Sequence, residues 1–93
     1  MTVTCDVVVR SKVGLHARPA AQFIKTASGF AARITLENLT RTTKPVNAKS
    51  ILSVLTAGVR MNDQIRITAD GVDEEAAIAA LSELINDNFG ETE

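Results

Sequence analysis

Two spacings of apolar residues alternate along this chain of 93 residues, and together they limit its possible folds more than any other feature. Three segments alternate apolar and polar residues, the period of a strand with one buried face: 2–9, 32–37 and 64–69. A shorter stretch, 42–46, is interpreted as a further strand. Three segments repeat apolar residues every three or four positions, as amphipathic helices do: 17–27, 47–55 and 73–85. The predicted order is therefore βαββαβα.

The polar faces of the strands indicate the kind of sheet. Each clear strand has one polar face, which favours an antiparallel sheet with helices packed on its other side. We predict the α+β class: a βαββαβα two-layer open-faced sandwich, with a four-stranded antiparallel sheet and three helices on one face. Pro45 cannot donate to a sheet ladder, so 42–46 is expected at an edge. Gly29 is expected to end the first helix in a left-handed conformation. The length and the lack of repeats predict a single domain over 1–93.

Composition argues against several classes of function. Aromatic residues make up 3% of the chain, without Trp or Tyr, and the formal net charge is −1, so nucleic-acid binding is not expected. Without a run of about eighteen apolar residues or a secretory signal pattern, we expect a cytoplasmic protein that does not bind membranes. Cys5 and a single histidine cannot make a usual zinc site or an internal disulfide. We therefore expect no metal and no cofactor.

The small net charge conceals an uneven distribution. Residues 10–66 carry all ten basic side chains and only two acidic ones, a net +8, whereas 67–93 carry eight acidic side chains and no basic one. Folding can interleave the two groups so that their fields cancel. It can also leave a basic face for an acidic partner or a phosphate. The sequence leaves both possibilities open.

The only histidine of the chain stands where a polar loop enters a helix. Gly14 allows a sharp turn, His16 follows two positions later, and Arg18 two positions after that. Unpaired N–H groups and the helix dipole attract phosphate to a helix N-terminus. A neutral imidazole has a nucleophilic nitrogen, and a guanidinium offers a fork of donors to phosphate oxygens.

Two questions about this segment stay open at the level of the sequence. Pro19 fits the first helical position with Arg18 as the cap, but an earlier start is also possible, and in both registers His16 lies within one turn of the helix start. A lone histidine in a loop can also be an ordinary surface residue, and the spacing alone does not decide.

Two motifs resemble those of the HPr family, the histidine-containing phosphocarrier proteins of the bacterial sugar phosphotransferase system. Gly14-Leu15-His16-Ala17-Arg18-Pro19-Ala20-Ala21 looks like the phosphorylation-site motif of that family. Val46-Asn47-Ala48-Lys49-Ser50-Ile51-Leu52 looks like its second signature. The resemblance extends over essentially the whole chain, and it implies a transiently phosphorylated carrier rather than an enzyme.

The resemblance also implies roles for residues. His16 would accept a phosphoryl group on Nδ1 from enzyme I, itself charged by phosphoenolpyruvate, and pass it to IIA-type sugar-transport proteins. Arg18 would stabilise the phosphoryl group, and the backbone N–H of Ala17 would bind it. Such a carrier is expected to be a monomer, because one face must serve successive partners.

Ser50 has two interpretations, which can both hold. It opens a short apolar helix, so it is a plausible N-cap. The resemblance implies a second role as a site phosphorylated by HPr kinase/phosphorylase. The phosphate would add a charge of about −1.5 to −2 and slow transfer without refolding.

The helix after Ser50 contains more apolar residues than one face can bury. Ile51, Val54 and Leu55 share one stripe, so Leu52 is expected to be exposed. The resemblance implies that partner proteins dock on an apolar centre with basic residues around it. The docking residues expected on this basis are Leu52, Ile51, Lys25, Lys49 and Ala20.

Departures from the family pattern and alternative functions complete the prediction. Val13 stands where the family often has a small polar residue able to bond the active-site ring, and the connection 38–44 is longer than usual. One alternative is an HPr-like carrier for another branch, related to dihydroxyacetone or to nitrogen. A second is a regulatory interaction protein that acts through Ser50 with an inert His16. A third is a small ligand-binding α+β domain.

Overall fold

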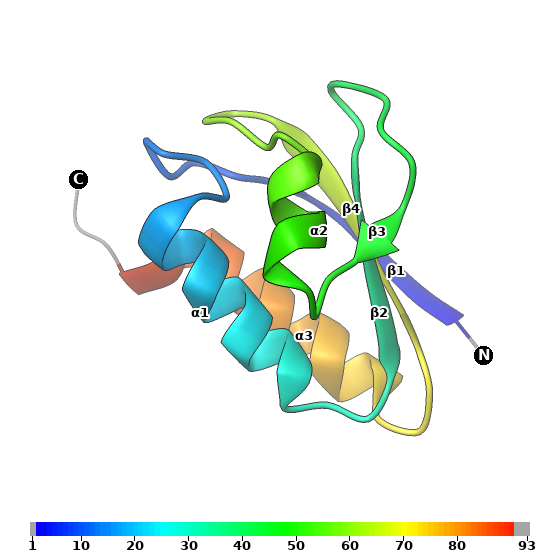
Figure 1. Ribbon diagram of the computed structural model, residues 1–93. Helices are drawn as coiled ribbons and strands as arrows, with labels where there is room; N and C mark the ends of the chain where they lie inside the picture. Colours follow the sequence, from blue (N-terminus) through cyan, green and yellow to red (C-terminus); the bar gives the residue numbers. More distant parts are fainter. Residues whose placement is uncertain (1, 91–93) are drawn as a thin grey trace.

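The computed structural model describes residues 2–90, and its elements follow the predicted order (Figure 1). The strands are β1 (Thr2–Val8), β2 (Arg33–Asn38), β3 (Val46–Asn47) and β4 (Gln64–Asp70). The helices are α1 (Ala17–Ser28), α2 (Ile51–Thr56) and α3 (Glu74–Asn86), followed by a 3₁₀ turn, η1 (Asn88–Gly90).

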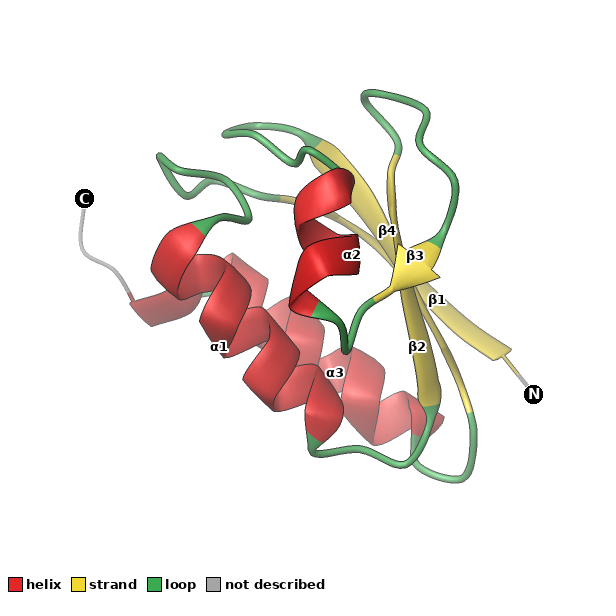
Figure 2. Cartoon of the chain, viewed as in Figure 1, coloured by secondary structure: helices red, strands yellow, loops and turns green. Residues whose placement is uncertain are grey.

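The strands form one antiparallel sheet in the order β1-β4-β2-β3. The three α-helices lie on the same side of it, and no element of residues 2–90 covers the other face (Figure 2). On that open face the register aligns Thr4, Thr68 and Thr35 across three strands. Arg66 of β4 forms a two-bond ion pair with Asp6 of β1, at 2.8 and 3.0 Å. The predicted α+β open-faced sandwich is confirmed.

The core lies between the sheet and the helices. In β1, β2 and β4, every second residue is apolar and points its side chain toward the helices. Phe23 of α1 and Leu81 of α3 are fully buried against them. Full burial of one such side chain is worth about 1.5–3 kcal/mol relative to exposure. The apolar strand residues with at most 1% exposure are Ile34, Leu36, Ile65, Ile67 and Ala69.

Two local predictions are wrong. The third strand occupies Val46–Asn47 at the sheet edge instead of 42–46. The buried Asn38 folds the segment into a turn, because its N–H donates to Thr43 Oγ1 at 2.9 Å and its Oδ1 accepts from the Arg41 N–H at 3.2 Å. Gly29 has φ −76°, so α1 ends in a right-handed turn in which the Gly29 N–H bonds the Thr26 carbonyl at 3.2 Å.

The helices of the described part of the chain are short. Over residues 2–90, none combines the length and the apolar character that crossing a bilayer requires.

Candidate functional site

The loop before α1 is fixed by the loop that joins α2 to β4. The Leu15 N–H donates to the Val59 carbonyl at 3.1 Å, and the Leu15 side chain is fully buried. Gly14 adopts φ +65°, and a Cβ there would overlap the Val59 carbonyl oxygen. The buried Leu15 anchors the end of the loop and leaves the next residue, His16, exposed.

His16 is the N-cap residue of α1, with extended backbone angles of φ −132° and ψ 166°. Its side chain makes no capping hydrogen bond, so the imidazole is not used to satisfy the amides of the helix. Pro19 is therefore in the first turn but not at its first position, and the earlier of the two predicted registers is the observed one. The described first turn contains no acidic residue, which leaves the positive end of the helix uncompensated beside the imidazole.

Ala17 departs from regular helix geometry directly after His16. Its φ of 52° lies in the left-handed region, which costs a residue with a Cβ about 1–2 kcal/mol. Strained backbone of this kind is typical of functional sites, where the surrounding structure holds it in place. Here His16 and Ala17 are exposed, whereas Leu15, two residues before Ala17, is buried, so the strain lies between the anchored loop and the helix.

Arg18 is exposed and is held from one side by another residue of α1. The Gln22 amide, one turn further on, lies against Arg18 Nε, and the donors and acceptors around it assign the amide oxygen to this side, where it accepts from Nε at 3.2 Å. The amide nitrogen of Gln22 donates to the Phe89 carbonyl at 3.0 Å. Gln22 was not among the residues predicted for the site, although its i, i+4 spacing from Arg18 is a signal for such a pair.

The start of α2 confirms two predictions and corrects one. Ser50 is the N-cap, and its Oγ accepts from the Ser53 N–H at 3.3 Å. Leu52 is 74% exposed, as predicted. Ile51 is 44% exposed, so its expected inward orientation is wrong, because the fully buried Val54 fills the core position in this short helix.

Two of the expected docking residues are not where a docking surface would need them. Ala20 has no exposed surface, so that prediction is wrong: its side chain faces the core from the first turn of α1. Lys49 Nζ donates to the Phe30 carbonyl at 2.6 Å, which directs this partly buried lysine toward the far end of α1. Lys25 is exposed in the last turn of α1.

Lys49 belongs to a cluster that joins three elements at that far end. The Asp73 carboxylate, before α3, accepts from the N–H groups of Ala31 and Ala32, both at 2.8 Å. The bond from Ala31, together with that from Ala32 and the charge of Lys49, lowers the pKa of Asp73. The segment that carries Ser50 is therefore tied to the ends of α1 and α3.

His16 and Ser50 lie at opposite ends of the α1–α2 pair. The loop before His16 contacts the residues after α2, whereas Lys49, directly before Ser50, contacts the residues after α1. The six residues of α2 alone span about 9 Å. Two unit charges at that distance in water interact by only about 0.5 kcal/mol. A phosphate on Ser50 would thus act on the surface between the two residues more than on His16 itself.

A buried carboxylate organises the loops behind the site. Asp63 is 4% exposed and accepts from the Arg60 N–H, from Asn38 Nδ2 and from Arg41 Nε, at 3.0 to 3.1 Å. Burial alone would raise the pKa of Asp63, but these hydrogen bonds outweigh it and hold the pKa below the ordinary value. The charged form of Asp63 is therefore the one that stabilises the loops.

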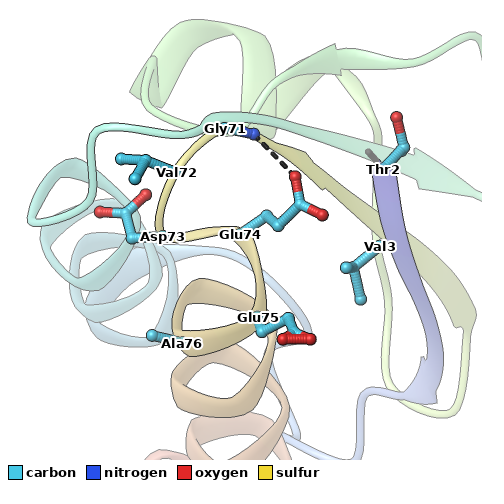
Figure 3. A pocket seen from close by; sticks show the side chains of 8 residues that line it. All are labelled: Thr2, Val3, Gly71, Val72, Asp73, Glu74, Glu75 and Ala76. Atoms are coloured by element: carbon cyan, nitrogen blue, oxygen red, sulfur yellow. Dashed lines mark hydrogen bonds between the residues drawn. The ribbon is translucent and has the colours of Figure 1, made fainter.

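A surface hollow of about 710 Å³ lies away from these residues, between the start of β1 and the start of α3 (Figure 3). Glu74 lines it and accepts from the Gly71 N–H at 3.0 Å, while Val72 is 96% exposed beside it. None of the predicted site residues lines this hollow.

Comparison with known proteins identifies the family. The profile described as the phosphorylation site of the PTS HPr component matches residues 3–87. The phosphocarrier protein HPr of Xylella fastidiosa is 41% identical over 86 residues, which cover 92% of this chain and 93% of that protein. The chain belongs to the HPr family. The resemblance to this family noted in the sequence is thereby confirmed.

Larger relatives share the same region. The multiphosphoryl transfer protein of Salmonella typhimurium is 38% identical over 96% of this chain, which spans only 24% of that protein. The phosphoryl donor subunit DhaM of a dihydroxyacetone kinase of Escherichia coli is 41% identical over 94% of this chain and 18% of its own length. The chain therefore spans about a quarter or less of these relatives.

Solved structures agree with the fold. HPr-C-His from Thermoanaerobacter tengcongensis superposes with a TM-score of 0.93 at 43% identity, covering 98% of this chain and 99% of that one. An HPr dimer from the same organism gives a TM-score of 0.76 at 46% identity, covering 91% and 94%.

Proposed function

We propose that this chain accepts a phosphoryl group on Nδ1 of His16 from enzyme I, charged by phosphoenolpyruvate, and passes it to IIA-type proteins for sugar uptake. The supporting observation is an exposed imidazole at the uncompensated N-terminus of α1, two residues before an exposed arginine, in a chain of the HPr family. We place the protein in the cytoplasm and expect it to act as a monomer.

The residues of the site have distinct tasks in this transfer. The lone pair of the neutral His16 imidazole attacks phosphorus, and the bond to the donor breaks with its electron pair remaining on the donor. Charge on the transferred oxygens is stabilised by Arg18 and by N–H groups at the start of α1, including that of Ala17. In the second transfer His16 is the leaving group. A carrier of this kind needs positioning and charge, and no substrate pocket.

We place partner docking on the exposed surface that extends from His16 along α1 and α2. Leu52 and Ile51 supply apolar area, and Lys25 supplies positive charge. Phosphorylation of Ser50 by HPr kinase/phosphorylase would place a phosphate at the N-terminus of α2, next to these residues, and slow docking. Purified kinase that leaves Ser50 unmodified would remove this regulatory role.

The decisive test is phosphorylation by enzyme I. The wild type and His16→Ala are incubated with enzyme I, magnesium and phosphoenolpyruvate, and intact mass and acid stability are measured. We expect the wild type to gain one acid-labile phosphoryl group and the variant to gain none. An unlabelled wild type in the presence of active enzyme I would contradict the proposal.

The similarity to DhaM favours a second candidate, a carrier that supplies a dihydroxyacetone kinase instead of sugar transport. Both candidates use the same chemistry at His16 and differ in the acceptor. Radiolabelled phosphorylated carrier is therefore offered to IIA proteins and to the subunits of such a kinase in parallel. The acceptor that is labelled faster identifies the branch.

A further inference from the structure

The side chain of Arg18 is held in a way that the proposed chemistry does not by itself require. Its Nε donates to the amide oxygen of Gln22 at 3.2 Å. A guanidinium carries five N–H donors in one plane, and a bond at Nε leaves the four donors of the two Nη groups available. Two of these four donors, one on each Nη, can still form a two-pronged contact with phosphate oxygens.

The orientation of the Gln22 amide is fixed by its second partner. Its nitrogen donates to the Phe89 carbonyl at 3.0 Å, so the amide nitrogen faces an acceptor while the amide oxygen faces a donor. The reversed amide would set two donors against each other at Arg18 and two acceptors at Phe89. Gln22 can therefore accept a hydrogen bond from Arg18 in only one orientation of its amide.

Phe89 provides a rigid end for this chain of hydrogen bonds. It is 3% exposed and packs in the core, and η1 contacts α3. Its φ of 57° is left-handed, as is the 52° of Asn88, and this backbone turns the Phe89 carbonyl toward α1. The turn after α3 is thus connected to the exposed arginine through one half-buried glutamine.

We propose that Gln22 is a positioning residue for phosphoryl transfer, acting through Arg18 and anchored by the turn Asn88–Gly90. This inference rests on the proposed role of His16 and Arg18. A free arginine side chain must lose its rotamer freedom when it contacts the phosphoryl group, and the bond to Gln22 removes part of that freedom beforehand. The loss of one such hydrogen bond corresponds to a decrease of about 2- to 10-fold in the transfer rate constant.

A double-mutant cycle tests the coupling. The rate constant for His16 phosphorylation by phosphorylated enzyme I is measured for the wild type, Gln22→Ala, Arg18→Ala and the double variant. We expect Gln22→Ala to slow transfer 2- to 10-fold when Arg18 is present. In the Arg18→Ala background it should have no further effect. Ser28→Ala, an exposed change in the same helix, is the control and should match the wild type.

Other outcomes have defined meanings. Equal effects of Gln22→Ala with and without Arg18 would assign Gln22 a direct contact with the partner and overturn the inference. A Gln22→Ala rate equal to that of the wild type would also overturn it, while leaving the proposed function intact. A wild type that enzyme I does not phosphorylate would instead remove the proposed function and this inference with it.

Gln22→Glu separates the two bonds of the amide. A carboxylate still accepts from Arg18 Nε, but it cannot donate to the Phe89 carbonyl. We expect this variant to keep the slowly exchanging Arg18 Nε–H signal in NMR spectra, which Gln22→Ala loses. An Nε–H signal that is the same in all three proteins would show that Gln22 does not hold Arg18.

Discussion

Gly14 combines two demands that a residue with a side chain cannot meet. Its φ is +65°, and a Cβ would lie 2.7 Å from Arg60 Cα as well as overlapping the Val59 carbonyl. Gly58 has a similar φ of +60°, but nothing lies within 4 Å of its Cβ position. An alanine at either position would strain the backbone, but only an alanine at Gly14 would also overlap other atoms.

We predict that Gly14→Ala destabilises the fold more than Gly58→Ala does. Gly58→Ala should lower the free energy of unfolding by about 1–2 kcal/mol, the cost of left-handed backbone for alanine. Gly14→Ala adds the displacement of the loop before His16, so it should lower it by about 2 kcal/mol more. Urea unfolding of both variants measures the difference. Equal stabilities would mean that the two loops separate easily.

Asp63 gives the fold a specific dependence on pH. Its pKa is lowered in the folded protein, so its contribution to stability is present above the unfolded value of about 3.9 and is lost as the pH falls through the folded value. In Asp63→Asn the amide meets three donors, so we expect a loss of about 1–3 kcal/mol at pH 7. The difference between the two proteins should shrink below about pH 4. Chemical unfolding from pH 7 to pH 3 measures it, and a constant difference would contradict the prediction.

At the scale of elements, Ser50 links the stability of α2 to its proposed regulation. Ser50→Ala removes the N-cap and should lower the free energy of unfolding by about 1 kcal/mol, without slowing transfer from enzyme I. Ser50→Asp keeps a capping oxygen and adds a negative charge, so it should retain stability and slow transfer. Thermal unfolding and the transfer rate are measured on both variants. Equal transfer rates would show that charge at Ser50 does not affect docking.

The sequence predicts correctly those strands in which apolar and polar residues alternate over enough positions to show which face is buried. β1, β2 and β4 alternate over six or seven residues, and each places the apolar residues of that alternation toward the helices. The third strand is only two residues long, too short for a period, and its position depends on Asn38 bonds to a loop that no local pattern reveals.

The same distinction applies to the site. The spacing of glycine, histidine and arginine predicts the exposed His16 at a helix start, because that geometry is local. The bond from Lys49 to the Phe30 carbonyl joins residues 19 positions apart, and the path from Gln22 to Phe89 reaches the other end of the chain. Contacts of this kind depend on how the helices pack, and the packing cannot be read from a single sequence.

Over the whole molecule, charge is separated between the two ends of the sheet. The three loops at the His16 end carry Arg10, Lys12, Arg41, Lys44 and Arg60. The turn at the opposite end carries Asp70, Asp73, Glu74 and Glu75. Asp63, in one of these loops, and Asp87, after α3, are acidic residues at the His16 end, and the opposite end also holds the basic Arg33 and Lys49. Folding thus keeps much of the asymmetry of the sequence instead of cancelling it.

This separation predicts that salt slows the encounter with an acidic partner. Raising the ionic strength from about 0.1 to 1 M shortens the Debye length from about 10 to about 3 Å. We expect the second-order rate constant with enzyme I to fall several-fold, while hydrolysis of the phosphohistidine, which involves no partner, stays nearly constant. Stopped-flow transfer measurements test this, and a rate constant independent of salt would exclude electrostatic steering.

The strand order also determines how the chain can fold. β4 lies between β1 and β2, so the first two strands do not pair with each other, and both must wait for residues 64–70 to find their common partner. A nascent chain that ends before residue 64 has two strands with open edges and only the short β2–β3 pair formed. Contacts between distant residues slow folding, because the loops between them must close first. Synthesis must therefore reach the last strand before any stable part of the sheet exists, and the domain folds as one unit.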